Sequence, residues 1–295
     1  MNNKERGFLL LTGHLGNPDR KPLTVAQFRI LAERASQMEK PLVSRELQEK
    51  DLMALGYDRP AANRILSLLS EEELLERYLF KGHRQGCVPV TRISGVYPAS
   101  VRTRLDLDAP GCLWAKGDLS LLENQTVSLV GSRQLLDSNR VFAETAGREV
   151  ACQGYTLVSG NAQGADRTAQ NACLEAGGKV ICVVADALEE HSTVENILYL
   201  SEDAFDESFS AQRALSRNRV IHTLGYITLV AQCDLEKGGT WDGTVRNLQK
   251  NWSPVFCFDD GSSAAVELAQ RGATLIDISR LSNLAELKPD SQSFI

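Results

Sequence analysis

Four short segments rich in glycine, hydroxyl or arginine residues are candidates for binding a negatively charged ligand. The first is Gly131-Ser132-Arg133, which directly follows an apolar run. Its glycine lets a phosphate approach the backbone, its serine can donate a hydrogen bond, and its arginine can bind two phosphate oxygens at once. The same residues could equally form a tight turn with an arginine on the surface. This segment alone leaves both interpretations open.

The second segment has the sequence Ser-Gly-Asn-Ala-Gln-Gly-Ala-Asp, and its candidate binding residues are Ser159, Gly160, Asn161, Gly164 and Asp166. The two glycines lie four residues apart and can form a nest of backbone N–H groups ahead of a helix. Asp166 can cap that helix or hold a neighbouring arginine. The segment has neither the Walker spacing nor the dinucleotide-binding fingerprint, which disfavours hydrolysis of a nucleoside triphosphate.

The third segment contains three arginines within seven residues: Arg213, Arg217 and Arg219. They lie in a part of the chain, residues 126–280, that carries 13 basic and 20 acidic residues, a balance of −7. A solvated surface does not need so dense a basic cluster in an acidic region, so we interpret the segment as a binding cluster. Asn218, between two of these arginines, can recognise a base edge or an oxygen atom.

The fourth segment, Gly238-Gly239-Thr240, again places a glycine pair and a hydroxyl before a predicted helix. Ligands of parallel α/β sheets bind beyond the carboxyl ends of the strands. Four such segments at one end of one sheet would converge on one place, which is a more specific signal than any single segment. The pattern therefore predicts a pocket for a phosphate-bearing ligand.

These segments are separated by apolar runs and by helices of about ten residues. Runs that are apolar throughout are typical of strands in a parallel sheet covered on both faces. We therefore predict an α/β fold with a doubly wound, mostly parallel sheet and right-handed connections. The predicted strands are 127–130, 156–158, 179–185, 226–233, 255–258 and 274–278, and the predicted helices include 140–152, 168–176, 220–224, 244–249 and 264–271.

The amino-terminal part is predicted to be helical, because residues 23–80 show apolar positions three and four residues apart. A second helix follows Ser44, and Ser70 begins another in the manner of a capping box. A turn at Gly56 resembles helix-hairpin-helix or SAM-like bundles, and a role in packing alone explains it equally well. Glycines and prolines mark 86–125 as a connecting segment, so we predict a small all-helical domain over 1–85 and a Rossmann-like domain over 126–295.

The composition is that of a soluble folded protein, with 295 residues, 43% of them hydrophobic, 24% charged, and a net charge of −6. No apolar run approaches the ~20 residues of a membrane span, and the amino terminus lacks an export signal. The seven cysteines are odd in number and lack zinc or redox spacing, and the four histidines are scattered. We expect a cytoplasmic protein with reduced thiols and without a metal site or cofactor.

Taken in order, the four segments resemble those of the DNA-processing protein A (DprA/Smf) family. That family carries a Gly-Ser-Arg after the first strand, then a Ser-Gly-X-Ala-X-Gly-(Ile)-Asp loop, an Arg-Asn-Arg segment and a Ser/Gly-Gly-(Thr/Ser) loop. Order and spacing agree over roughly residues 88–280, and the helical amino-terminal part has a counterpart in many members. The resemblance implies an extended Rossmann-like domain.

The resemblance also implies a function. The family binds single-stranded DNA as a homodimer, protects that DNA and assists the loading of a RecA-type recombinase during recombination or natural transformation, without catalysis. Matching positions imply that the loop 160–164 lines the pocket. They also imply two groups of phosphate contacts: Gly131, Ser132 and Arg133, and Arg217, Asn218 and Arg219.

The chain departs from the family pattern in three places. Ala214-Leu215 stand where the family has an aromatic-Pro pair suited to stacking a base. The loop 186–191 replaces a glycine-containing loop and adds negative charge, which would oppose phosphate binding there. The chain also ends soon after the sixth predicted strand, so we expect no carboxyl-terminal winged helix. The first two departures bear on how DNA would be held.

The same residues leave a second class of function open. Arg133 and the loop 238–240 could hold the phosphate of a small nucleotide or nucleotide-sugar, and Asp166, Glu202 or Asp242 could act as general acid or base. The acidic composition and the missing aromatic favour this alternative, whereas the lack of a recognisable catalytic carboxylate pair disfavours it. A scaffold with a degenerate site is the third alternative.

Overall fold

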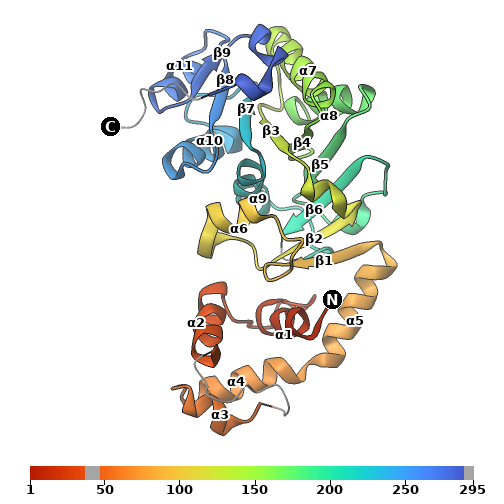
Figure 1. Ribbon diagram of the computed structural model, residues 1–295, viewed down its shortest axis with the longest axis vertical. Coiled ribbons are helices and arrows are strands. Elements are labelled where there is room, and N and C mark those ends of the chain that lie inside the picture. Colours follow the sequence, from red (N-terminus) through yellow and green to blue (C-terminus); the bar gives the residue numbers. More distant parts are fainter. Residues whose placement is uncertain (37–46, 203, 289–295) are drawn as a thin grey trace.

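The computed structural model of the protein describes residues 1–36, 47–202 and 204–288. A nine-stranded sheet with helices on both faces forms the upper part of the molecule in Figure 1, and a group of amino-terminal helices forms the lower part. The strands are β1 (Cys87–Thr91), β2 (Cys112–Gly117), β3 (Thr126–Val130), β4 (Thr156–Ser159), β5 (Lys179–Val183), β6 (Ile197–Glu202), β7 (Ile227–Val230), β8 (Val255–Phe258) and β9 (Thr274–Ile276).

The strand order in the sheet is β1-β2-β6-β5-β4-β3-β7-β8-β9. The strands from β3 to β9 run parallel, and β2 and β1 extend the sheet in antiparallel fashion beyond β6. The chain proceeds outward from β3 through β4 and β5 to β6, and then returns to the other side of β3 as β7. The carboxyl ends of β3 and β7 are therefore the topological switch point, where a crevice opens in sheets of this kind.

Helices cover the sheet on both faces. One face packs against α7 and α8, and the other against α6, α9, α10 and α11. None of the helices in the described ranges is long and apolar enough to span a membrane. The helices are α1 (Asn3–Thr12), α2 (Val25–Ser36), α3 (Glu49–Ala54), α4 (Arg59–Ser70), α5 (Glu72–Arg84), α6 (Ala99–Leu105), α7 (Asp137–Cys152), α8 (Ala165–Glu175), α9 (Ala211–Leu224), α10 (Gly238–Lys250) and α11 (Ser263–Gln270).

The central strand β3 illustrates why the strands are apolar throughout. Val127 and Leu129 belong to the cluster that includes Phe142 of α7, whereas Val130 belongs to the cluster that includes Val220 of α9. All of these side chains are buried. Removing an apolar side chain of this size from water contributes about 1.5–3 kcal/mol, so both faces favour the layered arrangement. The predicted α/β fold with a doubly wound, mostly parallel sheet is confirmed.

The sequence pattern misses the strands β1, β2 and β6. β1 contains Pro89, which has no N–H to donate and is tolerated because β1 is an edge strand. The glycines and prolines around β1 and β2 are typical of a connecting segment, yet both strands belong to the sheet. β5 and β6 are joined by a loop with only the short 3-10 helix Leu188–Glu190, so the alternation of strand and helix fails there. The division into domains stays a prediction.

The sequence pattern misses one amino-terminal helix and misplaces the start of another. The sequence pattern misses α1, which has a capping box: Glu5 N donates to Asn2 Oδ1 at 3.0 Å, and Asn2 N donates to Glu5 Oε2 at 2.8 Å. Ser70 does not begin α5, because its hydroxyl donates to the carbonyl of Ser67 within α4. The predicted helix after Ser44 corresponds to α3, although Ser44 itself lies outside the described residues.

The turn at Gly56 joins α3 to α4 and has a left-handed backbone, with φ of +85°. Asp58 then caps α4, since its carboxylate accepts a hydrogen bond from Ala61 N at 2.9 Å. A helix N-terminus attracts anions, and this one already holds a carboxylate from its own chain. The arrangement favours the packing role for this helical pair over phosphate binding.

Candidate functional site

A pocket of about 630 Å³ lies beyond the carboxyl ends of β3 and β7. It is lined by the start of the β3–α7 loop, by the beginning of α8, by the first half of α9 and by the loop that leads into α10. The four segments singled out in the sequence therefore converge, as the position of the switch point requires. Of the predicted site residues, those that line the pocket are Gly131, Ser132, Arg133, Asp166, Arg217, Asn218, Gly238, Gly239 and Thr240.

Close backbone contacts hold the loops of the pocket together. Ala165 N donates to Ser132 O at 3.0 Å, and Thr240 Oγ1 donates to Gly131 O at 2.9 Å. Gly164 has a φ of +81°, and a Cβ there would lie 2.3 Å from Ser132 O. This glycine is therefore required by the approach of two loops, and it shapes the pocket without lining it.

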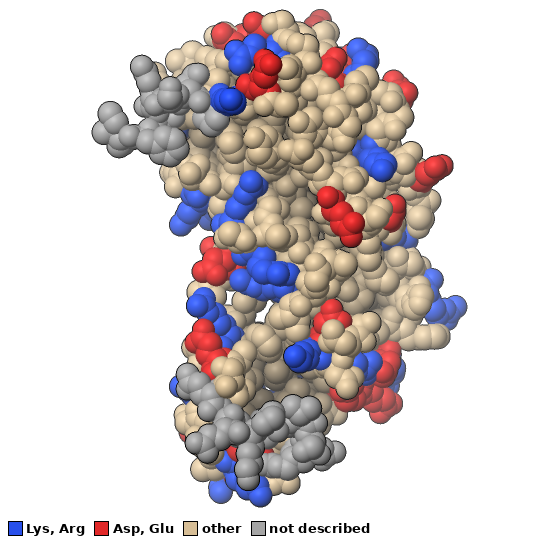
Figure 2. Space-filling model, viewed as in Figure 1, with Lys and Arg blue, Asp and Glu red and all other residues tan. Residues whose placement is uncertain are grey.

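Two cationic side chains on the pocket wall have no partner among the described residues. Arg133 and Lys237 are exposed, and neither side chain makes a hydrogen bond or ion pair within that part of the chain. The carboxylate of Asp234 lies on the same wall. Figure 2 shows basic and acidic side chains interspersed over the face in view, without a broad basic area. Arg133 and Lys237 thus supply unpaired positive charge at the pocket wall.

A buried pair, Asp166 and Arg217, forms the floor of the pocket. Asp166 Oδ2 accepts hydrogen bonds from Gly160 N at 3.0 Å and from Ala162 N at 3.2 Å, and Arg217 Nη2 donates to Gly160 O at 3.0 Å. Asp166 thus orders the 160–162 loop by binding its backbone, which neither sequence interpretation anticipated. A Cβ at Gly160 would fall 1.7 Å from the Arg217 guanidinium, so only glycine fits there.

Burial shifts the pKa of both members of this pair. Burial raises the pKa of Asp166. The Arg217 guanidinium and the two backbone N–H groups act in the opposite direction, because they favour the carboxylate. Burial lowers the pKa of Arg217, against the attraction of Asp166 and Glu202. Arg217 is 9% exposed, and its Nε–H has no hydrogen-bond partner among the described residues. This donor is itself buried, so it belongs to the interior of the floor and not to the surface that a ligand meets.

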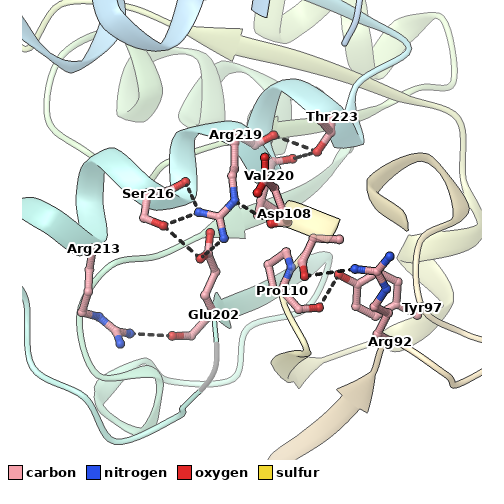
Figure 3. Close-up of polar contacts among 12 residues, drawn as sticks. Arg92, Tyr97, Asp108, Pro110, Glu202, Arg213, Ser216, Arg219, Val220 and Thr223 are labelled. Atoms are coloured by element: carbon pink, nitrogen blue, oxygen red, sulfur yellow. Dashed lines mark hydrogen bonds and ion pairs between the residues drawn. The ribbon is translucent and has the colours of Figure 1, made fainter. Parts of the chain in front are cut away.

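The other two arginines of the predicted cluster point elsewhere (Figure 3). Arg219 Nη2 pairs with Glu202 Oε2 at 3.0 Å, and its Nε donates to Asp108 O at 3.1 Å. Arg213 Nη2 donates to Ser201 Oγ at 2.9 Å. All three arginines lie on α9, where residues advance by about 100°, so positions 217 and 219 face nearly opposite directions.

The remaining predicted residues, Ser159 and Asn161, support the pocket from behind. Ser159 is buried and its hydroxyl accepts a hydrogen bond from Gln170 of α8. Asn161 adopts a left-handed backbone with φ of +61°. Asp186, whose charge was expected to oppose phosphate, pairs with His191 at 3.0 Å and does not line the pocket. The acidic 186–191 loop therefore lies outside the pocket lining, although the Asp186 carboxylate attracts the Arg217 guanidinium of the pocket floor.

Sequence reasoning missed Phe209, which lines the pocket and is 58% exposed. It stands in the segment between β6 and α9, just before Ser210 caps α9 by accepting from Arg213 N at 3.1 Å. No motif in the sequence marks Phe209, because it lies in the loop between an unpredicted strand and the arginine cluster of α9. An exposed aromatic ring beside a glycine-rich, basic pocket offers a surface on which a planar group can stack.

His222 lines the pocket but adds no positive charge to it. Burial lowers the pKa of His222 to about 3. Its Nδ1 lies 3.2 Å from Asn247 Nδ2, and Asn247 Oδ1 accepts from Ser253 N at 2.9 Å. This second bond sets the orientation of the Asn247 amide, so Nδ1 of His222 accepts a hydrogen bond and the ring is neutral.

The three carboxylates proposed as general acid or base do not converge. Asp166 lies in the pocket floor, whereas Glu202 is paired with Arg219. Asp242 lines a separate hollow of about 320 Å³ on the far side of Leu215 and Asn218. No group of three His, Cys, Asp or Glu within the described ranges could hold a metal ion, and the seven cysteines form no disulfide.

Comparisons with known proteins agree on one family. The family model described as DNA recombination-mediator protein A matches residues 89–286. DNA processing protein DprA of Bacillus subtilis (strain 168) is 27% identical over 217 residues, which covers 68% of this chain and 72% of that protein. Protein Smf of Escherichia coli (strain K12) is 29% identical over 189 residues, covering 57% of this chain and 49% of that protein.

Solved structures show the same fold. The X-ray structure of DNA processing protein A from Streptococcus pneumoniae has a TM-score of 0.74 and 24% identity, covering 98% of this chain and 99% of that one. A structure that describes the single-stranded DNA binding mode of DNA processing protein A from Helicobacter pylori has a TM-score of 0.57 and 24% identity, covering 68% of this chain and 95% of that one. The first match extends over the amino-terminal helices as well as the sheet.

Proposed function

Because the chain belongs to the DNA recombination-mediator protein A family, we propose that it binds single-stranded DNA in the pocket and acts in DNA processing, recombination or natural transformation. The observation that carries the proposal is the convergence of four loops on a pocket at the switch point, with Arg133 unpaired on its wall. The family match spans every residue that lines this pocket. The H. pylori relative, whose structure describes single-stranded DNA binding, supports the choice of ligand.

Phosphate groups are the part of DNA that the pocket suits best. Arg133 and Lys237 supply exposed positive charge, and the N-terminus of α10, at Gly238 and Gly239, lies on the wall. Backbone N–H groups at a helix N-terminus attract phosphate. The Arg217 guanidinium adds positive charge at the floor. The residues Arg213 and Arg219 are left out of the phosphate contacts and hold α9 in place.

A base is best accommodated by Phe209. The family's aromatic-Pro pair is replaced here by Ala214 and Leu215, of which Leu215 is exposed on the pocket wall. Phe209 also lines the pocket, directly before the N-cap of the helix that carries these residues. Stacking of a base on an aromatic ring contributes about 1–3 kcal/mol, so Phe209 compensates for the missing aromatic. Paired bases in a duplex are not free to stack there, which favours single strands.

Binding without catalysis accounts for the site better than hydrolysis of a small nucleotide. Asp166 is the one member of the proposed acid–base set that lines the pocket, and its Oδ2 already binds two backbone N–H groups. General acid–base chemistry needs a group that reaches the reacting atoms and can exchange its proton. Asp166 instead holds the loop of the pocket in shape.

The finer parts of the proposal follow from the family. We propose that the protein acts in the cytoplasm as a homodimer, protects single-stranded DNA and assists the loading of a RecA-type recombinase. The description of the family as a recombination mediator supports the last step. Light scattering at increasing protein concentration tests the dimer. Recombinase filament formation on oligo-dT coated with single-strand binding protein tests the loading, and no acceleration by this protein would contradict it.

Fluorescence anisotropy with labelled oligo-dT and with a duplex of equal length tests the proposed binding. We expect the full chain to bind the single strand more tightly. Arg133→Ala should weaken that binding about tenfold, because one charge-assisted contact is lost. Arg148→Ala is the matched control: Arg148 is exposed on α7, outside the pocket, and its loss should change affinity less than twofold.

Two results would contradict the proposal. Absence of binding to oligo-dT at low salt would remove the DNA ligand, and equal effects of Arg133→Ala and Arg148→Ala would remove the pocket from the binding path. If small phosphorylated nucleotides bound instead, and Arg133→Ala abolished that binding, the nucleotide alternative would replace the DNA proposal.

A further inference from the structure

The segment that carries Phe209 is attached to the amino-terminal helices. Asp206 lies three residues before Phe209, between β6 and α9. Tyr78 Oη donates to Asp206 Oδ1 at 2.8 Å, and Lys81 Nζ pairs with Asp206 Oδ2 at 2.6 Å. Both partners belong to α5. One carboxylate thus joins the last amino-terminal helix to the segment that leads to the pocket.

Three aromatic rings surround this attachment. The ring centroids of Tyr78 and Phe205 are 4.8 Å apart, those of Trp114 and Phe205 are 4.7 Å apart, and those of Tyr78 and Trp114 are 5.3 Å apart. All three side chains are buried. A Cβ at Gly82 would lie 2.8 Å from the Trp114 ring, so glycine lets α5 lie against the cluster. The attachment is therefore rigid and largely shielded from water.

The chemistry of Tyr78 makes its hydrogen bond durable. Burial and the charge of Asp206 raise the pKa of Tyr78, so the hydroxyl stays protonated. It therefore donates a hydrogen bond to the Asp206 carboxylate. The Asp206 side chain is 14% exposed, and a charge-assisted hydrogen bond in such surroundings is stronger than one in water. Downstream, Ser210 caps α9 and holds the other end of the segment.

We propose that α5, acting through Asp206, positions Phe209 for stacking on a base, so that the amino-terminal helices are part of the DNA-binding site. Asp206 is a positioning residue in this scheme, because it does not line the pocket. Phe209 is the exposed aromatic side chain between two fixed points, Asp206 and Ser210. The inference rests on the proposed single-stranded DNA binding and names the part of the chain that prepares the base contact.

Removing the Asp206 carboxylate has opposite expected effects on DNA affinity, depending on whether its charge or its contact with α5 matters. DNA is an anion, so removing a carboxylate near its site strengthens binding if only the long-range field matters. Glu207 provides the matched control, since it is exposed, adjacent to Asp206, and its side chain makes no hydrogen bond or ion pair in the described part of the chain. Asp206→Asn and Glu207→Gln therefore change the charge equally, and only Asp206→Asn removes the ion pair with Lys81 and weakens the hydrogen bond from Tyr78.

The test combines these variants with Phe209→Leu in the full chain, using oligo-dT and anisotropy. Asp206→Asn should weaken binding about fivefold or more, while Glu207→Gln leaves it unchanged or slightly stronger. Phe209→Leu should cost about fivefold or more in the wild-type background, the low end of base stacking, and less than twofold in the Asp206→Asn background. Such non-additivity reports that Asp206 acts through Phe209.

Tyr78→Phe provides a second variant that changes neither charge nor packing volume and removes one hydrogen bond to Asp206. It should weaken binding in the same direction, and thermal unfolding verifies that each variant is folded. The inference is overturned if the Phe209→Leu loss is as large in Asp206→Asn or Tyr78→Phe as in the wild type. If wild-type protein fails to bind oligo-dT, or Arg133→Ala has no effect, it is the proposed function that fails instead.

Discussion

Arg217 and Arg219 are two residues apart on α9 and have different surroundings. Arg217 lies in the pocket floor beside Asp166, whereas Arg219 is paired with Glu202 behind the pocket. From the sequence, the Arg-Asn-Arg segment reads as one binding unit. The helical rotation between the two positions, together with the missed strand that supplies Glu202, separates them. The residue types were enough to predict a binding segment. Predicting where each arginine side chain points also required the boundaries of the helix.

Replacing Arg219 is expected to affect stability more than DNA binding. Arg219→Met leaves the buried Glu202 carboxylate without its ion-pair partner, which costs on the order of 3 kcal/mol. Urea unfolding measures this loss, and adding Glu202→Gln should recover part of it. The folded variant should bind oligo-dT with wild-type affinity. A large loss of affinity with unchanged stability would show instead that Arg219 contacts DNA.

His222 should make the folded protein sensitive to acid. Its pKa is about 3 in the folded state and near 6.5 in the unfolded chain, so only the unfolded state takes up the proton between these values. Stability is therefore complete above about pH 6.5 and falls as the pH decreases, by about 2 kcal/mol per histidine between pH 6.5 and 5. Urea unfolding at several pH values should show a flatter dependence for His222→Gln. An identical dependence in the variant would contradict the neutral, buried ring.

The loops after β3 and β4 form one element of the site, because Gly164 brings them into contact. Gly164→Ala would place a methyl group 2.3 Å from Ser132 O at a positive φ, at an expected cost on the order of 3 kcal/mol. Gly154→Ala is the matched control, since its φ is +79° but nothing lies within 4 Å of the added methyl. It should cost about 1 kcal/mol. Equal costs in urea unfolding would mean that the loop contact contributes nothing.

At the level of elements, strands that alternate with helices along the chain could be predicted, and strands outside that alternation could not. β3, β4, β5, β7, β8 and β9 are apolar runs next to helices, so their pattern is sufficient. β1 and β2 lie at an antiparallel edge with Pro89 and Lys116 among their residues, and β6 follows a loop without a long helix. Loops after recognised strands were therefore found, and Phe209, after an unrecognised one, was missed.

The whole molecule joins two parts that the sequence presents as separate. The amino-terminal helices pack on the sheet through Tyr78, Trp114 and Phe205. These residues are far apart in the sequence, so no local pattern reveals the contact. Acidic and basic side chains are interspersed over the visible face (Figure 2), and the pocket combines two unpaired cations, Arg133 and Lys237, with the glycine-rich loops. Affinity for DNA should accordingly depend on few contacts.

The salt dependence of oligo-dT binding tests this account most directly. The slope of log K against log salt measures the phosphates neutralised, at about 0.7 per phosphate on a single strand. We predict that Arg133→Ala makes the slope shallower by about that amount, and that Arg148→Ala leaves it unchanged. Parallel lines for wild type and Arg133→Ala would show that Arg133 contacts no phosphate and would contradict the assignment of the pocket as the DNA-binding site.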